Sequence, residues 1–403
     1  MALTPPSKIP PTKSLPSQVP AHTRGRFVWA GGLSLLAWGA LRIVAPGAAI
    51  PWTPPMVEAA TAMDAVSGSV TRYCRDTGIL IEVGVDPNGT CLVGPAYTEL
   101  FTSLGQLEAK RTTTTPDVSG LMVHLLSEAG VEKGDRVAVG ASGSFPALMV
   151  ATLIAVEALG AEPVTILSLG ASSFGATRPA FHLIDLYELL EAGGVVSGPP
   201  AAVSLGGSGD VGAEFDPAFR AGLLRELLGS EVPVLQNPDL RANVAERMAF
   251  YGFGTSGRAP SDVAEAPELA AFVNIGGAEM NLGISPKILN LPSGLVGGPS
   301  IAESRTVDGP IDLPPEIERG VLFEMVSRGV PVIHLLHVRG LTLRYGLPWD
   351  PRPLPKPGST RFRDAQQGKN FRFWLLTAAY LGALALAAFG GRSRGPRIVR
   401  QPG

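Results

Sequence analysis

The sequence predicts an α/β fold, a mostly parallel β-sheet with helices on both faces (Rossmann-like), built as one body or as two subdomains. Strand-like and helical segments alternate through the middle of the 403-residue chain, which is the pattern of such folds. Several strand-like segments also end in Gly/Ser turns, where open α/β sheets bind ligands.

Residues 133–175 form the central unit of this prediction: a strand, a Gly/Ser turn, a helix and a second strand. Ser144 is suited to cap the helix, and Pro146 stands near its first position, where a missing N–H costs least. The helix is apolar on nearly every side, so we expect it to be buried. A strand–helix–strand unit of this length has parallel strands and a right-handed crossover.

The other elements follow from periodicity and from their start and stop residues. Helices are expected at residues 54–77, 117–130, 181–191, 217–228, 239–251 and 315–327. Strands are expected at residues 202–205, 232–235, 271–275 and 331–338. The turn sequence Asp86-Pro87-Asn88-Gly89 predicts a β-hairpin between residues 79–85 and 91–93.

Two apolar segments near the chain ends are long enough to cross a bilayer. Residues 27–50 are expected to form a transmembrane helix or signal anchor, although Gly47-Ala48-Ala49 also resembles a signal-peptide cleavage site. Residues 371–390 have aromatic residues at their start and arginines after them, as a spanning helix does. Basic residues outside both segments place the chain ends in the cytoplasm, with residues 51–347 as an extracytoplasmic α/β domain.

The remaining segments are predicted from composition. Residues 1–26 are rich in Pro, Ser and Lys and are expected to be a disordered cytoplasmic tail, and residues 391–403 a basic cytoplasmic tail. Residues 348–370 begin with a Pro-rich run and are expected to form an extended stalk. The only cysteines, Cys74 and Cys91, form either a disulfide or two buried thiols.

Composition and motifs exclude several functions. The formal net charge is −2 and charged residues make up 17% of the chain, so nothing favours a nucleic-acid partner. The dinucleotide fingerprint and the phosphate loop are absent, and we expect no cofactor. His334 and His337 are three apart on an expected strand, hence on opposite faces, and no residue spacing indicates a metal site.

The candidate binding residues lie at the expected strand ends, where small residues let backbone N–H groups approach an anion. Lys110 and Arg111, next to four threonines, would add positive charge for a carboxylate, unless they belong to a solvated helix end. The strand-end candidates are Gly140, Ser142, Gly143, Ser144, Ser172, Ser173, Gly206, Gly207, Asp210, Asn274, Gly276 and Gly277.

Two alternatives for the first Gly/Ser turn stay open. Ser142 is a candidate catalytic nucleophile with Lys110 as its base, although the pattern G-x-S-x-G fails because Ser144 stands where glycine is required. In the second alternative, the turn is a tight structural connection that binds no ligand.

Four runs of the chain resemble the poly-gamma-glutamate system protein family: YTELFTSLGQLEAKRTTTTPD, GDRVAVGASGSFPALMVA, SLGASSFGAT and FVNIGGAEMNLG. The resemblance covers most of residues 55–345. It implies a protein of the bacterial cytoplasmic membrane that takes part in making, exporting or processing an anionic γ-linked glutamate polymer. It brings no established catalytic mechanism that maps onto these residues.

Three hypotheses result from the sequence. The first is a membrane-anchored accessory component of poly-gamma-glutamate (capsule or exopolymer) biosynthesis or export, binding the polymer or the synthase and export subunits. The second is an extracytoplasmic serine-dependent hydrolase or transpeptidase acting on the same polymer. The third is a structural tether without a ligand.

Overall fold

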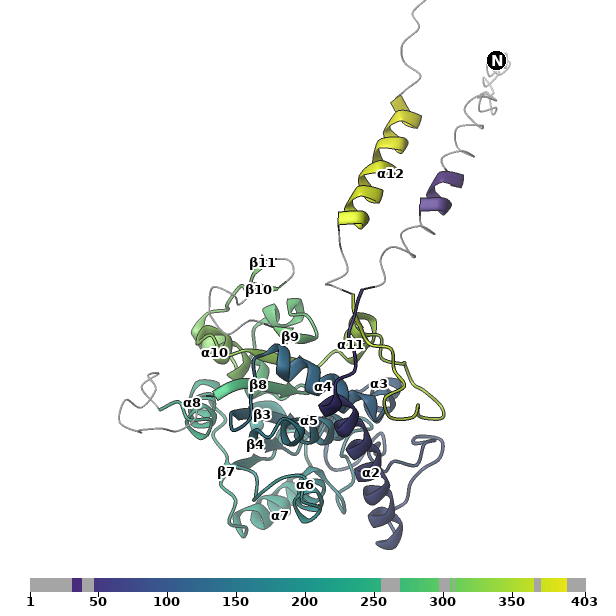
Figure 1. Cartoon of the computed structure of the whole chain (residues 1–403). Helices are drawn as coiled ribbons and strands as arrows, with labels where there is room; N and C mark the ends of the chain where they lie inside the picture. Colours follow the sequence, from purple (N-terminus) through teal and green to yellow (C-terminus); the bar gives the residue numbers. More distant parts are fainter. Residues whose placement is uncertain are drawn as a thin grey trace, which may run out of the picture. The chain divides into compact units, whose positions relative to one another are not determined.

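The computed structural model describes residues 31–37, 47–254, 269–296, 305–306, 309–365 and 371–389 (Figure 1). The chain divides into residues 49–366 and a second unit made of residues 1–48 and 367–403. The larger unit is α/β with a mostly parallel central sheet, as the sequence predicts. It forms one unit rather than two subdomains.

The central sheet has seven strands in the order β7-β6-β4-β3-β8-β12-β9. All neighbours are parallel except β9, which runs antiparallel to β12. From β3 the chain builds outward through β4, β6 and β7, then returns to place β8 on the other side of β3, so the strand order reverses there. The strands are β3 (Arg136–Ser142), β4 (Glu162–Ser168), β6 (Ala202–Ser204), β7 (Val234–Leu235), β8 (Leu269–Ile275), β9 (Gly294–Val296) and β12 (Val332–Leu335).

Each face of the sheet carries its own hydrophobic core. Along β3, Val137 and Val139 belong to one buried cluster and Ala138 to the other, because successive strand side chains point to opposite faces. The first cluster takes in α2 (Pro54–Asp76), α4 (Asp117–Glu128), α5 (Pro146–Ala158), α6 (Leu183–Ala192) and α7 (Pro217–Leu228). The second takes in α8 (Leu240–Phe250) and α10 (Val321–Ser327).

The expected burial of the central helix is confirmed, since all of α5 except its last two residues is buried. The helix expected at 315–327 is interrupted: a short 3-10 turn, η3 (Glu316–Glu318), precedes α10. Other short elements are β1 (Ala48–Ala49), β2 (Phe101–Ser103), α3 (Leu107–Thr113), β5 (Ala171–Ser172), η1 (Ser208–Asp210), α9 (Glu279–Leu282), η2 (Pro286–Asn290), β10 (Arg305–Thr306), β11 (Gly309–Pro310), α11 (Val338–Tyr345) and β13 (Arg363–Asp364).

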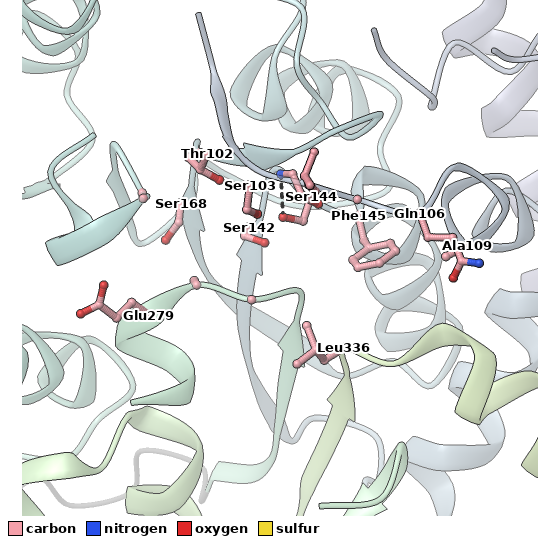
Figure 2. A pocket seen from close by; sticks show the side chains of 18 of the residues that line it. Thr102, Ser103, Gln106, Ala109, Ser142, Ser144, Phe145, Ser168, Glu279 and Leu336 are labelled. Carbon is pink, nitrogen blue, oxygen red and sulfur yellow. Dashed lines mark hydrogen bonds between the residues drawn. The ribbon is translucent and has the colours of Figure 1, made fainter. Parts of the chain in front are cut away.

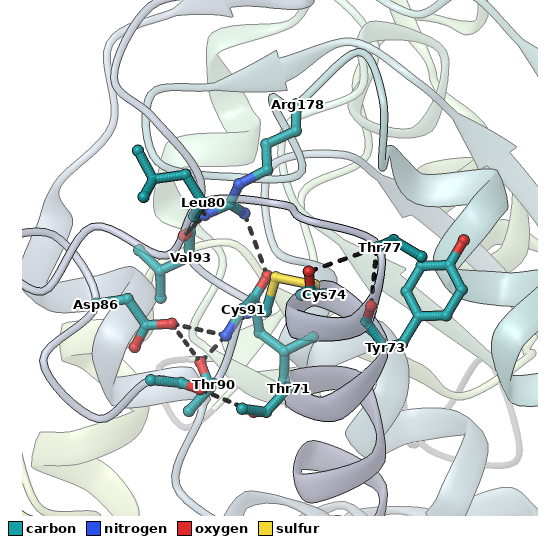
Figure 3. Close-up of a disulfide and its surroundings, with 12 residues drawn as sticks. Thr71, Tyr73, Cys74, Thr77, Leu80, Asp86, Thr90, Cys91, Val93 and Arg178 are labelled. Atoms are coloured by element: carbon teal, nitrogen blue, oxygen red, sulfur yellow. Dashed lines mark hydrogen bonds between the residues drawn. A yellow bond between two sulfur atoms is a disulfide. The ribbon is translucent and has the colours of Figure 1, made fainter.

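The hairpin expected after α2 is wrong, because residues 79–85 and 91–93 form no strands. A disulfide between Cys74 and Cys91 ties this loop to the end of α2, which settles the alternative that the sequence left open (Figure 3). The Asp86 carboxylate accepts a hydrogen bond from the N–H of Cys91 over 2.8 Å, and Arg178 donates to the carbonyl oxygens of Cys91 and Val93. The loop is held by side chains rather than by strand pairing.

The Pro-rich segment is not a free stalk over residues 348–365, because it packs on the α/β unit. The two carboxylate oxygens of Asp117 accept hydrogen bonds from the N–H groups of Gly358 and Thr360 over 2.6 and 2.8 Å. Trp52 Nε1 donates to the carbonyl oxygen of Thr360 over 2.8 Å. A segment without strand or helix pairing can bury its backbone when side chains supply the partners. Residues 366–370 lie outside the described residues.

The second unit contains a helix over residues 31–37 and α12 (Phe371–Phe389). Among the described residues, no helix is both long and apolar enough to cross a membrane. The spans at residues 27–50 and 371–390 therefore stay predictions. Residues 27–30 and 38–46, like the two tails at 1–26 and 391–403, lie outside the described residues.

Candidate functional site

A cavity of about 420 Å³ opens at the carboxyl ends of the parallel strands (Figure 2). The ends of β3, β4, β6, β8 and β12 all contribute to it, and residues 102–106, from β2 and the loop between β2 and α3, form another wall. The cavity lies where the strand order reverses between β3 and β8, the position at which open α/β sheets bind ligands. Its volume suits a small ligand or a few units of a chain molecule.

The structure divides the candidates predicted from the sequence into two groups. Those that line the cavity are Lys110, Ser142, Ser144, Ser172, Gly206, Gly207 and Gly277. Those that lie outside its lining are Arg111, Gly140, Gly143, Ser173, Asp210, Asn274 and Gly276.

Lys110 is the most constrained group in the cavity wall. It lies on α3 and is only 2% exposed, with Nζ 3.8 Å from the centroid of the Phe145 ring. Nζ donates hydrogen bonds to the carbonyl oxygen of Ser144 and, over 2.7 Å, to Ser172 Oγ. Burial lowers the pKa of Lys110 from 10.5 to about 7, since the charged form loses its hydration. Lys110 is therefore a group that exchanges its proton near neutral pH.

Ser142 ends β3 and lines the cavity, but its hydroxyl is directed elsewhere. Its Oγ donates to the carbonyl oxygen of Ile275 over 3.3 Å, and no hydrogen bond joins it to Lys110, both residues being fully described. The glycine at 276 is needed here, because a Cβ would come within 2.2 Å of Ser142 Oγ and the backbone has φ +81°. The predicted pair of Ser142 with Lys110 is thus not formed.

Two carboxylates and, besides Lys110, two basic side chains also line the cavity. Glu279 accepts a hydrogen bond from the N–H of Gly209 over 3.0 Å, and Glu214 accepts from Ser208 N–H over 3.0 Å. His337 and Arg339 follow β12, and both are exposed. The cavity therefore has acidic groups near η1 and basic groups near the end of β12.

Arg111 does not enter the cavity, contrary to the prediction. Its guanidinium donates to the carbonyl oxygens of Val85 and Gly84 over 2.7 and 2.6 Å and lies 3.6 Å from the Asp350 carboxylate. Successive helix residues point about 100° apart, so the side chains of Lys110 and Arg111 contact different parts of the structure. Arg111 holds the loop after α2 and the Pro-rich segment against the unit.

Asp210 also lies outside the cavity, because it is the partner of a buried arginine. Its carboxylate accepts from Arg247 over 2.6 Å, from Ser204 Oγ over 2.8 Å and from Asn243 Nδ2 over 3.2 Å. Arg247 is fully buried, so its charge requires a compensating carboxylate. Asp210 therefore lies outside the cavity lining and compensates the buried charge of Arg247.

Asn274 and Gly140 are buried inside the sheet. Asn274 Nδ2 donates to His334 Nδ1 over 3.1 Å, and burial lowers the pKa of His334 to about 4, so that its ring is neutral and accepts. A Cβ at Gly140 would come within 2.5 Å of the Asn281 side chain. Both positions lie outside the cavity lining and are enclosed by neighbouring side chains.

Gly143 and Ser173 also lie outside the cavity lining, and both are closely packed. A Cβ at Gly143 would come within 2.4 Å of the carbonyl oxygen of Leu169. Ser173 is buried, and its N–H donates to the carbonyl oxygen of Ser103 over 2.9 Å. Both residues shape the turns that hold Ser144 and Ser172 at the cavity.

Sequence reasoning missed several lining residues. His337 was expected on a buried strand, yet β12 ends at Leu335 and His337 precedes α11. Arg339, Glu214 and Gln106 are common surface residues without a motif, so no local signal distinguishes them. The described residues contain no group of three or more His, Cys, Asp or Glu side chains that could hold a metal ion.

Comparisons with known proteins assign no family. No family model matches the chain, and no curated protein matches it significantly. Among solved structures, an archaeal alanine:glyoxylate aminotransferase matches with a TM-score of 0.18 and 11% identity, over 90% of this chain and 72% of that chain. At that TM-score the match carries no argument about fold or function.

Proposed function

We propose that the protein is an accessory component of poly-gamma-glutamate production or export, anchored to the bacterial cytoplasmic membrane, and that its α/β unit binds the polymer in the strand-end cavity. The sequence resemblance supports the pathway, and the apolar segments at residues 27–50 and 371–390 support the anchoring. The cavity supports the ligand class.

The observation that carries this proposal is the arrangement of charge in the cavity. Each γ-glutamyl unit carries one carboxylate and one amide, and the chain end carries an ammonium group. Arg339 and His337 suit the carboxylates, while Glu214 and Glu279 suit amide N–H groups or the terminal ammonium. The Ser144 hydroxyl and the backbone of the glycines after β6 add further polar groups to the cavity wall.

The test is binding of fluorescent γ-glutamate oligomers to the purified full-length chain, measured by anisotropy. Arg339→Ala should weaken binding about five- to tenfold, because an exposed charge-assisted contact contributes about 1 to 1.4 kcal/mol. Arg225→Ala, an exposed arginine in the last turn of α7 outside the cavity, is the matched control and should not change the affinity.

Specificity separates this proposal from general attraction to polyanions. An α-linked glutamate oligomer has the same charge per residue but a different spacing, and it should bind more weakly. Equal binding of both oligomers, or an affinity that Arg339→Ala leaves unchanged, would contradict the proposal. Binding of neither oligomer would contradict the proposal and favour the third hypothesis, a structural tether without a ligand.

The membrane anchoring is tested independently of the ligand. The full-length chain should stay with bacterial membranes after alkaline carbonate washing, and the α/β unit should be cut by protease added outside spheroplasts. Release by carbonate, or protection of the α/β unit until the cells are lysed, would contradict the proposed location.

A further inference from the structure

We propose that Ser172 and Lys110 are a nucleophile and its general base, and that the cavity carries out acyl transfer on an amide. The inference rests on the proposed function for its substrate, the γ-glutamyl amide bond, and it moves the nucleophile away from Ser142.

The direct observation is the contact between the two side chains. Lys110 Nζ lies 2.7 Å from Ser172 Oγ, the distance required for proton transfer, and both residues line the cavity. The Lys110 amine is fixed by the Ser144 carbonyl oxygen and by the Phe145 ring, so it approaches Ser172 from a single direction. A serine hydroxyl becomes a nucleophile when such a base is in place.

Ser172 is itself held by its backbone. It lies in β5, which pairs with β2 so that Ser172 is opposite Ser103, and its N–H donates to Ser144 Oγ over 3.1 Å. At Gly105 a Cβ would lie 3.1 Å from both Ser172 Oγ and Lys110 Cε, so only glycine leaves this space open. The fold thus keeps the hydroxyl and the amine together beside the cavity.

Protonation of Lys110 is set by its surroundings. The charged and titratable groups that line the same cavity are Glu214, Glu279, His337 and Arg339, yet burial is the cause that lowers the pKa of Lys110. With a pKa of about 7, a large share of the amines is neutral at physiological pH and able to accept a proton.

The reaction needs two reactants, the γ-glutamyl amide and an acceptor that is either water or the amine of another chain. Ser172 Oγ attacks the amide carbonyl carbon while its proton passes to Lys110 Nζ. The C–N bond then breaks, and Lys110 gives that proton to the leaving nitrogen, which departs as an amine. Water, or the amine of another chain, attacks the resulting ester, its proton returns through Lys110, and Ser172 Oγ regains a hydrogen. When water is the acceptor, the product is a shortened polymer. When an amine is the acceptor, the product is a new amide.

The experiment is covalent labelling of the full-length chain with an alkyl fluorophosphonate, with the adduct located by mass spectrometry. We expect the adduct on Ser172, formed about tenfold faster at about pH 8.5 than at about pH 6 as Lys110 loses its proton. Lys110→Met should slow labelling at least about a hundredfold. Ser173 holds its turn through its backbone N–H, and its buried Oγ has no hydrogen-bond partner, so Ser173→Ala should leave the rate unchanged.

The pH profile of the unaltered chain keeps the test valid if Lys110→Met fails to fold. No adduct, an adduct on Ser142, or a rate independent of pH would overturn the assignment. Labelling of Ser172 without shortening or transfer of γ-glutamate oligomers would overturn the substrate and keep the reactive pair. Oligomer binding without labelling would refute the catalytic pair while supporting the proposed function.

Discussion

The buried pair of Asp210 and Arg247 is expected to control the stability of the α/β unit. The informative change is Asp210→Asn, which removes the charge and keeps the shape of the side chain. The backbone at Asp210 has φ +63°, a conformation that asparagine tolerates, so the substitution introduces no new backbone strain. What remains is an arginine with 0% exposure and no carboxylate beside it.

The size of the effect follows from that burial. Breaking a buried ion pair by removing one partner costs about 3–5 kcal/mol, because the other charge stays in the interior uncompensated. That is a large share of the about 5–15 kcal/mol by which domains are stable. Arg247 also donates hydrogen bonds to the hydroxyls of Ser168 and Ser204. These neutral hydroxyls cannot compensate its charge as a carboxylate does.

The assay is urea unfolding of the full-length chain in a double-mutant cycle. Asp210→Asn and Arg247→Met should each be strongly destabilising. The double variant should cost less than their sum by about 2–3 kcal/mol, since it leaves no lone charge. Strictly additive costs, or a loss below about 1 kcal/mol for Asp210→Asn, would refute this account of the pair.

Three further predictions follow from the structure. Reducing the disulfide, or changing Cys74 and Cys91 to alanine, should lower the free energy of unfolding by about 3 kcal/mol, because the bond closes a loop with a sequence separation of 17; urea midpoints with and without reductant check this. The Lys110 pKa is about 7 in the folded chain and 10.5 as a free side chain, so between these values the unfolded state binds more protons and stability rises with pH. Relative to Lys110→Met, unfolding free energy should thus rise by about 1 kcal/mol per pH unit above neutrality, and parallel curves would contradict this. Arg111→Met should lower stability by about 2 kcal/mol through its lost backbone contacts and leave oligomer affinity unchanged, so a weaker affinity would return Arg111 to the binding site.

The fold class and the position of the cavity could be derived from local patterns. Alternating strands and helices require parallel strands, and parallel strands bring their carboxyl ends to one edge. The Gly/Ser turns after β3, β4, β6 and β8 therefore had to lie close together, wherever the individual side chains point. The burial of α5 could also be derived locally, because the helix is apolar on nearly every side.

Side-chain direction could not be derived in this way. Lys110 and Arg111 are adjacent in sequence, but the helix turns one into the cavity and the other toward Asp350. Asp210 follows a strand, as a binding residue would, but its carboxylate pairs with Arg247, which lies 37 residues further along the chain in α8. The contact of Lys110 with Ser172 likewise spans 62 residues.

The sequence by itself thus determined the parallel sheet, its small-residue strand ends and their common edge, because these depend on local periodicity and on chain direction. Only the tertiary structure decided which hydroxyl faces Lys110, which charges are neutralised inside, and that residues 348–365 lie against the α/β unit. Those outcomes depend on contacts between distant segments, and short-range patterns carry no information about which distant side chain completes a hydrogen bond or an ion pair.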